Sequence, residues 1–127
     1  MSAAHHVCVV DDDQSIRIAL ASLLRSLEYE VETFESGTDA LRWLAWHQTA
    51  CVVSDLQMPG LSGLQLCQAM LDMGIRTPVL LITAYPTAQS EAKALGLGVH
   101  AFLTKPVSAR VLEMHVQNAI AAGLTGR

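Results

Sequence analysis

Short apolar segments alternate with helix-like segments along the whole 127-residue chain, and this alternation constrains the fold more than any other feature. Five segments have the length and the β-branched content of strands, namely 6–10, 30–34, 51–55, 78–83 and 100–104. The first, third and fourth are almost entirely apolar, which is typical of central strands in a parallel sheet covered on both faces. Residues 30–34 (EVETF) alternate between polar and apolar, which favours an edge strand.

Each predicted strand is followed by a segment with apolar residues at helical spacing. Ser36 with Asp39, and Ser62 with Gln65, have the spacing of N-terminal capping boxes. The last helix is expected to start after an N-cap at Ser108. The predicted helices cover 15–27, 36–47, 62–74, 87–98 and 108–123, where Gly123 is the expected stop.

Five strands, each followed by a helix, predict a doubly wound α/β domain of the flavodoxin-like (βα)5 type. Right-handed crossovers and helices on both faces favour a five-stranded parallel sheet in the order 2-1-3-4-5. We expect residues 1–127 to form a single domain with a core from about 6 to 122, long enough to need no disulfide or structural metal. In such a sheet, chemistry gathers at the carboxyl ends of the strands.

Charge and hydropathy exclude several classes of function. The net charge of −4 and the isoelectric point near 5.6 argue against direct nucleic-acid binding by this domain. The apolar runs are far too short for a membrane span, and the start, MSAAHH, does not resemble a signal peptide. Cys8, Cys51 and Cys67 lie in apolar stretches without metal-ligand spacing. We therefore expect buried cysteines and a cytoplasmic location.

Charged and polar residues follow the predicted strands at the carboxyl edge of the sheet. They are Asp11, Asp12 and Asp13 after the first strand, Asp55 and Thr83 at the ends of the third and fourth, and Lys105 after the fifth. Neighbouring carboxylates repel one another, and more strongly where water is excluded, so a cation is expected among them. Oxygen ligands without His or Cys favour Mg²⁺. Asp13 has two interpretations, a third metal ligand or, preferably, the N-cap of the following helix.

Four segments, in this order, resemble the signature blocks of the receiver domain of two-component response regulators. They are VVDDDQSIR, VVSDLQMPGLSGLQL, PVLLITAY and GVHAFLTKPV. The resemblance extends from about His6 to Ala122 and includes the patterns D-x-x-M-P-G-x-x-G and L-x-K-P. It is nearest to receivers of the nitrogen-fixation and nitrogen-regulation type.

The resemblance implies that Asp55 is the phosphoacceptor, which takes a phosphoryl group from a sensor histidine kinase or a phosphotransfer protein. Mg²⁺ would be held by Asp12 directly, by Asp11 through water, by Asp55 and by the backbone carbonyl of Gln57. Lys105 would pair with Asp55 at rest and with phosphoryl oxygens afterwards. These roles suit phosphoryl transfer, which needs a positioned nucleophile and neutralised oxygens.

The resemblance also implies a conformational switch. Thr83 would hydrogen-bond a phosphoryl oxygen, and Phe102 would change between outward and inward rotamers. The surface of the fourth helix, fifth strand and fifth helix would then change. The Lys105–Pro106 peptide bond would be cis. Gln57 and Tyr85, which lie two residues beyond Asp55 and Thr83, depart from the family pattern, and we expect them to flank the approach to the phosphoryl group.

Partners follow from the same resemblance. A kinase would dock on the first helix near Ser15, through Ile16, Leu20 and neighbouring residues that are expected to be exposed. The output would be a DNA-binding domain or another protein target. A phosphorylation-dependent homodimer would form through the same switch surface. The domain would be a signalling phosphoacceptor rather than an enzyme, with Mg²⁺-dependent self-phosphorylation and autodephosphorylation only, and with no membrane contact.

Two other functions are considered. Asp11-x-Asp13 after a strand resembles the D-x-D signature of haloacid-dehalogenase-type phosphatases, in which Asp11 would be the nucleophile. That interpretation leaves the DLQMPG and LTKP segments unexplained. The other alternative is a receiver-like binding module that takes no phosphate, but every position of the acidic pocket is filled.

Overall fold

The computed structural model describes residues 5–125, which form a parallel sheet of five strands. The strands are β1 (His6–Val10), β2 (Glu30–Phe34), β3 (Cys51–Asp55), β4 (Val79–Thr83) and β5 (Ala101–Thr104). Their order is β2-β1-β3-β4-β5, and each neighbouring pair is parallel. The predicted fold class and strand order are therefore confirmed, and β2 is an edge strand as its alternating sequence indicated.

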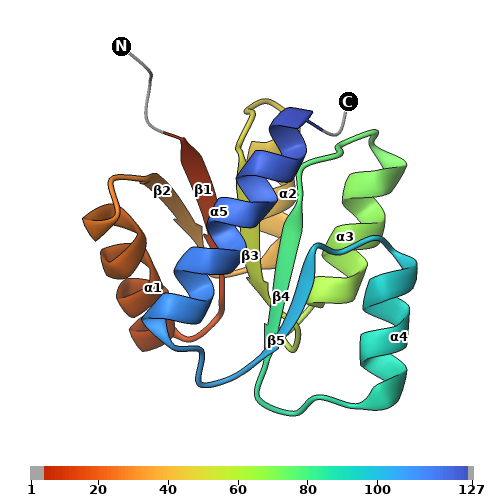
Figure 1. Cartoon of the computed structure of the whole chain (residues 1–127). Helices are drawn as coiled ribbons and strands as arrows, with labels where there is room; N and C mark the ends of the chain where they lie inside the picture. Colours follow the sequence, from red (N-terminus) through yellow and green to blue (C-terminus); the bar gives the residue numbers. More distant parts are fainter. Residues whose placement is uncertain (1–4, 126–127) are drawn as a thin grey trace.

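Helices cover both faces of this sheet (Figure 1). They are α1 (Gln14–Ser26), α2 (Gly37–Leu44), α3 (Gly63–Asp72), α4 (Ala88–Gly96) and α5 (Ala109–Thr125). α1 and α5 pack on one face, while α2, α3 and α4 pack on the other. Because side chains alternate along a strand, Val7 and Val9 of β1 pack in the core beneath α1 and α5. Cys8 and Val10 pack in the core beneath α2, α3 and α4.

The N-terminal signals of the helices are mostly as predicted. Ser62 and Gln65 form a complete capping box at α3, since each side chain accepts a bond from the other's backbone N–H. At α2, the Ser36 hydroxyl accepts a bond from the backbone N–H of Asp39. The backbone N–H of Val111 bonds the Ser108 hydroxyl at the start of α5. These polar side chains satisfy donors that the first helical turn leaves unpaired.

The predicted ends of α2 and α5 are wrong, whereas Gly74 and Gly98, the predicted ends of α3 and α4, directly follow the C-caps of those helices. α2 ends at Leu44, before the predicted end at residue 47. α5 continues through Gly123 to Thr125. Gly123 does not adopt the positive φ of a helix-terminating glycine, whereas Gly98, just after α4, does so with φ of 82°. A glycine therefore stops a helix here only where the chain turns into the left-handed region.

The three cysteines are buried as expected. Burial raises the pKa of each of Cys8, Cys51 and Cys67 to about 12. Their thiols therefore stay protonated and act as small apolar groups of the core. Within residues 5–125 we also find no helix with the length and apolar character needed to cross a membrane.

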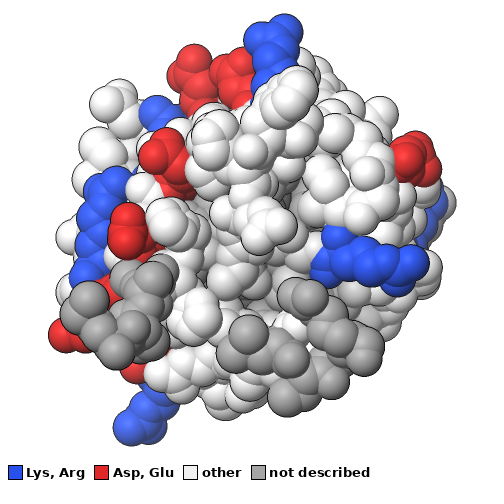
Figure 2. Space-filling model, turned by 90° about the horizontal axis from the view of Figure 1, so that it is seen from above, with Lys and Arg blue, Asp and Glu red and all other residues white. Residues whose placement is uncertain are grey.

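The two ends of the sheet differ in character. β1 begins and α5 ends on the same side of the molecule (Figure 1). Seen from that side, charged side chains lie around the periphery and the middle of the face is uncharged (Figure 2). The turns that follow the strands lie at the opposite end, and the acidic residues predicted to bind metal are among them.

Close packing at Gly63 joins α3 to the end of β3. A Cβ atom at this position would lie 2.5 Å from the carbonyl oxygen of Asp55 and 2.9 Å from Leu81 Cδ2. The backbone N–H of Gly63 also donates to the carbonyl oxygen of Leu56 over 2.8 Å. The helix therefore approaches the strand that positions Asp55 more closely than any residue with a side chain would allow.

We predict that Gly63→Ala lowers the free energy of unfolding by about 1–3 kcal/mol, the usual effect of overpacking a filled site. Gly96→Ala is the matched control, because a Cβ there meets nothing within 4 Å. That control should leave stability unchanged or slightly increased. Urea denaturation of both variants measures the difference, and equal stability of the two would contradict the packing argument.

Candidate functional site

The carboxyl ends of β1 and β3 lie side by side, because these strands pair in parallel with Val10 beside Ser54. Asp11 follows β1 directly and Asp55 is the last residue of β3. Asp11 is 1% exposed and Asp55 is 7% exposed, so both carboxylates have lost most of their contact with water. Asp12 is exposed beside them, and one carboxylate oxygen from each of the three lies within 4.8 Å of the others.

Lys105 places its ammonium between the two buried carboxylates. Lys105 Nζ lies 3.2 Å from Asp55 Oδ1 and 3.3 Å from Asp11 Oδ2. The lysine follows β5, and its backbone N–H donates to the carbonyl oxygen of Thr83 over 2.8 Å. The next peptide bond, Lys105–Pro106, is cis, as the resemblance implied. The expected pair with Asp55 is thus present, and the second partner, Asp11, was not expected.

Burial and the Asp55–Lys105 ion pair act in opposite directions on the pKa values of the two residues. Burial raises the pKa of Asp55, and Asp11 raises it further, while Lys105 lowers it. For Lys105, burial lowers the pKa, but Asp11 and Asp55 together raise it above its usual value. The ammonium therefore stays charged at neutral pH, and the ionised form of Asp55 is disfavoured in spite of it.

Backbone contacts hold Asp11 in place. Its N–H donates to the carbonyl oxygen of Phe34 over 3.1 Å, across the end of β2. Its Oδ1 accepts a bond from the backbone N–H of Asp13 over 2.9 Å. Its carbonyl oxygen accepts a bond from Arg17 Nη1 over 2.8 Å. Sequence reasoning did not single out Arg17, because only the packing of α1 shows that its side chain turns back to the loop.

Asp13 is the N-cap of α1. Its Oδ1 accepts bonds from the backbone N–H groups of Ser15 and Ile16, at 2.9 and 3.2 Å. It does not belong to the cluster formed by Asp11, Asp12 and Asp55. Of the two interpretations of Asp13, the structure therefore supports the preferred one, the N-cap, and not a third metal ligand.

Thr83 and Phe102, the predicted switch residues, lie on the next two strands of the sheet. Thr83 is the last residue of β4 and is fully buried. Its hydroxyl donates to Gln57 Oε1 over 2.8 Å and accepts a bond from the backbone N–H of Tyr85 over 3.0 Å. Phe102 is half-buried on β5 and packs against the core beneath α2, α3 and α4.

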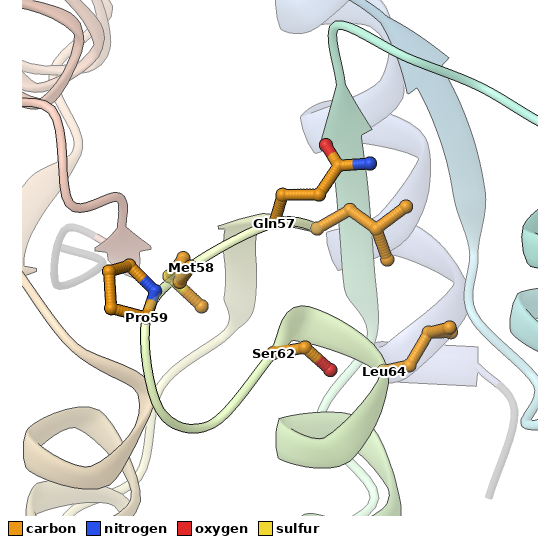
Figure 3. A pocket seen from close by; sticks show the side chains of 6 residues that line it. Gln57, Met58, Pro59, Ser62 and Leu64 are labelled. Carbon is orange, nitrogen blue, oxygen red and sulfur yellow. The ribbon is translucent and has the colours of Figure 1, made fainter.

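Gln57 lies in the loop after β3, with its side chain extending over the sheet edge (Figure 3). It lines a pocket with residues from this loop and from the start of α3, namely Leu56, Met58, Pro59, Ser62 and Leu64. The sequence predicted the backbone carbonyl of Gln57 as a metal ligand and placed this residue beside the approach to the phosphoryl group, and both assignments stay predictions. The bond from Thr83 to its side chain was not anticipated.

The chemistry of the acidic cluster fits a divalent cation. Three carboxylates and one ammonium leave a formal charge of −2, which a single dication balances. The available donors are carboxylate oxygens, which hard cations prefer. The exposed Asp12 leaves one side of the cluster open to solvent, so an ion has a route into it.

With this geometry in view, comparison with known proteins identifies the family. A family model described as "Response regulator receiver domain" matches residues 7–117. The chain belongs to this family. It is a receiver domain of the kind found in two-component response regulators, and the resemblance deduced from the four sequence blocks is confirmed. The assignment gives no support to the haloacid-dehalogenase alternative.

Named relatives agree with this assignment. The chain is 43% identical over 103 residues to the transcriptional regulatory protein TdiR of Thauera aromatica, covering 81% of this chain and 45% of that protein. It is 33% identical over 120 residues to the transcriptional regulatory protein FixJ of Bradyrhizobium diazoefficiens, covering 94% of this chain and 58% of that protein. FixJ supports the predicted subtype. The chain thus spans about half the length of these two relatives.

Solved structures agree on the fold of the receiver domain. The chemotaxis protein CheY4 of Vibrio cholerae superposes with a TM-score of 0.85 at 28% identity. The superposition covers 92% of this chain and 99% of CheY4. The five-stranded doubly wound architecture is therefore common to both proteins.

The raised pKa of Asp55 predicts a pH-dependent stability difference. A carboxyl whose pKa is higher in the folded state destabilises the fold when it is ionised. In a metal-free buffer, Asp55→Asn should therefore raise the free energy of unfolding at neutral pH. The gain should shrink as the pH falls through the raised pKa of Asp55 towards 3.8, its ordinary value, because the parent carboxyl is then protonated in both states.

Urea denaturation over a pH series, with a chelator present, measures this effect. Asp12→Asn serves as the comparison, since Asp12 is exposed and its substitution should change stability less. An Asp55→Asn variant that is less stable than the parent at neutral pH would show that the Lys105 ion pair outweighs burial.

Proposed function

We propose that this receiver domain accepts a phosphoryl group on Asp55 from the phosphohistidine of a sensor histidine kinase or a phosphotransfer protein. The observation that supports this most strongly is the setting of the Asp55 carboxylate. It lies at a strand end, 3.2 Å from an ammonium and within 4.8 Å of two other carboxylates. Among residues 5–125, Asp11 and Asp12 are the only other carboxyls in such a cluster.

In the proposed reaction, a carboxylate oxygen of Asp55 forms a bond to phosphorus while the bond between phosphorus and the histidine nitrogen breaks. The product is an acyl phosphate. Attack needs the ionised carboxylate, and Lys105 favours that form by lowering the pKa of Asp55 against the effect of burial. After transfer, the same ammonium lies close enough to pair with the new phosphoryl oxygens.

Asp11, Asp12 and Asp55 would hold Mg²⁺, with the backbone carbonyl of Gln57 as a further ligand. When bound, the ion supplies positive charge that stabilises the transferred phosphoryl group. The hydrogen bonds from Asp13 N–H to the side chain of Asp11 and from Arg17 to its carbonyl fix the orientation of this ligand before any ion arrives.

The signal would leave the site through Thr83 and Phe102. A phosphoryl group on Asp55 adds negative charge and hydrogen-bond acceptors near the Thr83 hydroxyl. Movement of that hydroxyl would free space for Phe102 to turn inward, and so would alter the surface made by α4, β5 and α5. A near-complete reversal of populations requires about 5.5 kcal/mol of bias.

The partners we propose are a kinase or phosphotransfer protein at α1 and an output on the switch surface. On α1, Ile16 and Leu20 are half-buried rather than exposed, and Leu20 packs against the core. The exposed Ile18 is therefore a better apolar contact for a kinase than Leu20. TdiR and FixJ are named transcriptional regulators. A DNA-binding domain or another protein target is therefore the proposed output, and phosphorylation-dependent homodimerisation is the alternative.

The proposed chemistry is confined to Mg²⁺-dependent self-phosphorylation and autodephosphorylation, with no turnover of a separate substrate. The buried, protonated thiols fit a reducing cytoplasm.

The first test of this function is labelling with acetyl phosphate and Mg²⁺, followed by peptide mapping. The parent should gain one phosphoryl group on Asp55, and Asp55→Asn should lose essentially all labelling because the nucleophile is gone. Chelation of Mg²⁺ should have the same effect. Asp39→Asn, at an exposed position on α2, should be labelled like the parent. Labelling on Asp11 instead would revive the phosphatase alternative.

The second test separates the metal ligands from the helix cap. Asp12→Asn should weaken Mg²⁺ binding at least about 10-fold, since even indirect partners of a metal site contribute that much. Asp13→Ala should bind Mg²⁺ within a few-fold of the parent but lose about 1 kcal/mol of stability, because it removes the N-cap of α1. Calorimetric titration and urea denaturation measure the two quantities, and similar Mg²⁺ affinities for both variants would contradict the assignment.

A further inference from the structure

The hydroxyl of Thr83 is fully engaged in hydrogen bonds. It accepts one from the backbone N–H of Tyr85 at 3.0 Å and donates one to Gln57 Oε1 at 2.8 Å. Thr83 itself is 0% exposed, so water does not readily replace either partner. The hydroxyl is therefore held in a definite orientation by a side chain from the loop that follows Asp55.

A threonine hydroxyl has one proton to donate. As long as that proton is bonded to Gln57 Oε1, it is not available to a phosphoryl oxygen on Asp55. The two bonds exclude each other, and any state in which Thr83 donates to the phosphoryl group must first break its bond to Gln57. The free energy of that bond enters directly into the equilibrium between the resting and the phosphorylated arrangement.

We propose that the side chain of Gln57 is a latch that holds Thr83 in the resting orientation and sets how readily the domain switches. The inference rests on the proposed phosphorylation of Asp55. In this scheme Gln57 has two separate functions. Its backbone carbonyl is the proposed metal ligand, and its amide oxygen is a positioning group that acts through Thr83.

The location of Gln57 suits a releasable latch. The residue is exposed, so its amide finds water as soon as it leaves Thr83. The backbone N–H of its neighbour Leu56 donates to the carbonyl oxygen of Ile82 over 2.8 Å, which ties the loop after β3 to β4 next to Thr83. The amide is therefore held within reach of the hydroxyl by the sheet itself. The Gln57 side chain reaches from the loop towards the end of β4 (Figure 3).

Gln57→Met tests the latch, because it keeps the length of the side chain and removes the acceptor. A neutral hydrogen bond of this type shifts an equilibrium by about two- to ten-fold. We expect Gln57→Met to bind beryllofluoride, a phosphoryl mimic, two- to ten-fold more tightly than the parent at saturating Mg²⁺. Gln57→Asn, which draws the amide back by one methylene, should show the same direction. Gln48→Met, at the opposite edge of the sheet, is the control and should bind like the parent.

A double-mutant cycle shows whether the effect passes through the hydroxyl. In a Thr83→Val background the proton is absent, so adding Gln57→Met should no longer change beryllofluoride affinity. An independent measurement without beryllofluoride or Mg²⁺ is the NMR signal of the Tyr85 amide, which donates to the same hydroxyl. It should shift in Gln57→Met and stay unchanged in Gln48→Met.

The outcomes are distinguishable. Unchanged affinity in Gln57→Met, or an equal change in the parent and Thr83→Val backgrounds, would overturn the latch while leaving phosphorylation of Asp55 intact. If the parent fails to bind beryllofluoride, or if Asp55→Asn binds it as tightly as the parent does, the proposed function fails and the latch fails with it.

Discussion

Two carboxylates buried side by side, those of Asp11 and Asp55, are the constraint on which the rest of this structure depends. Parallel pairing of β1 with β3 places them together, and burial makes their repulsion costly. The domain offsets this cost only in part, with the ammonium of Lys105. The remaining negative charge explains why the site suits a dication and why the proposed phosphoryl transfer would need one.

Lys105 also connects the buried carboxylates to the neighbouring strands β4 and β5. Lys105 follows β5, and its backbone is bonded to Thr83 at the end of β4. Asp55 ends β3, Thr83 ends β4 and Lys105 follows β5, and these three strands are neighbours in the sheet. A change of charge at Asp55 would act on Thr83, which ends β4, and on Lys105, which follows β5. β4 contacts α5, and β5 contacts α4. Proximity in the sheet, rather than a long chain of contacts, would link the proposed phosphorylation to the proposed switch surface.

Neighbouring residues in the acidic turn have unlike environments and unlike functions. Asp11 is buried and bonded to Lys105, Asp12 is exposed at the open side of the cluster, and Asp13 caps α1. The chain leaves a strand and enters a helix within these three positions, so Asp11 and Asp12 each bring an oxygen into the acidic cluster while the Asp13 carboxylate caps the helix. Three identical side chains in a row therefore do not make three metal ligands.

The sequence by itself determined the fold, the strand order and which residues meet at the carboxyl edge, because strand and helix periods, caps and the carboxyl-edge rule are local or topological. Only the tertiary structure decided three bonds of the site, which join Lys105 to Asp11 in addition to the expected Asp55, Arg17 to the backbone of Asp11, and Thr83 to Gln57. It also decided that Gly123 continues α5. The physical reason is that periodicity assigns a residue to an element and an edge, whereas hydrogen-bond partners depend on ångström-scale distances set by packing.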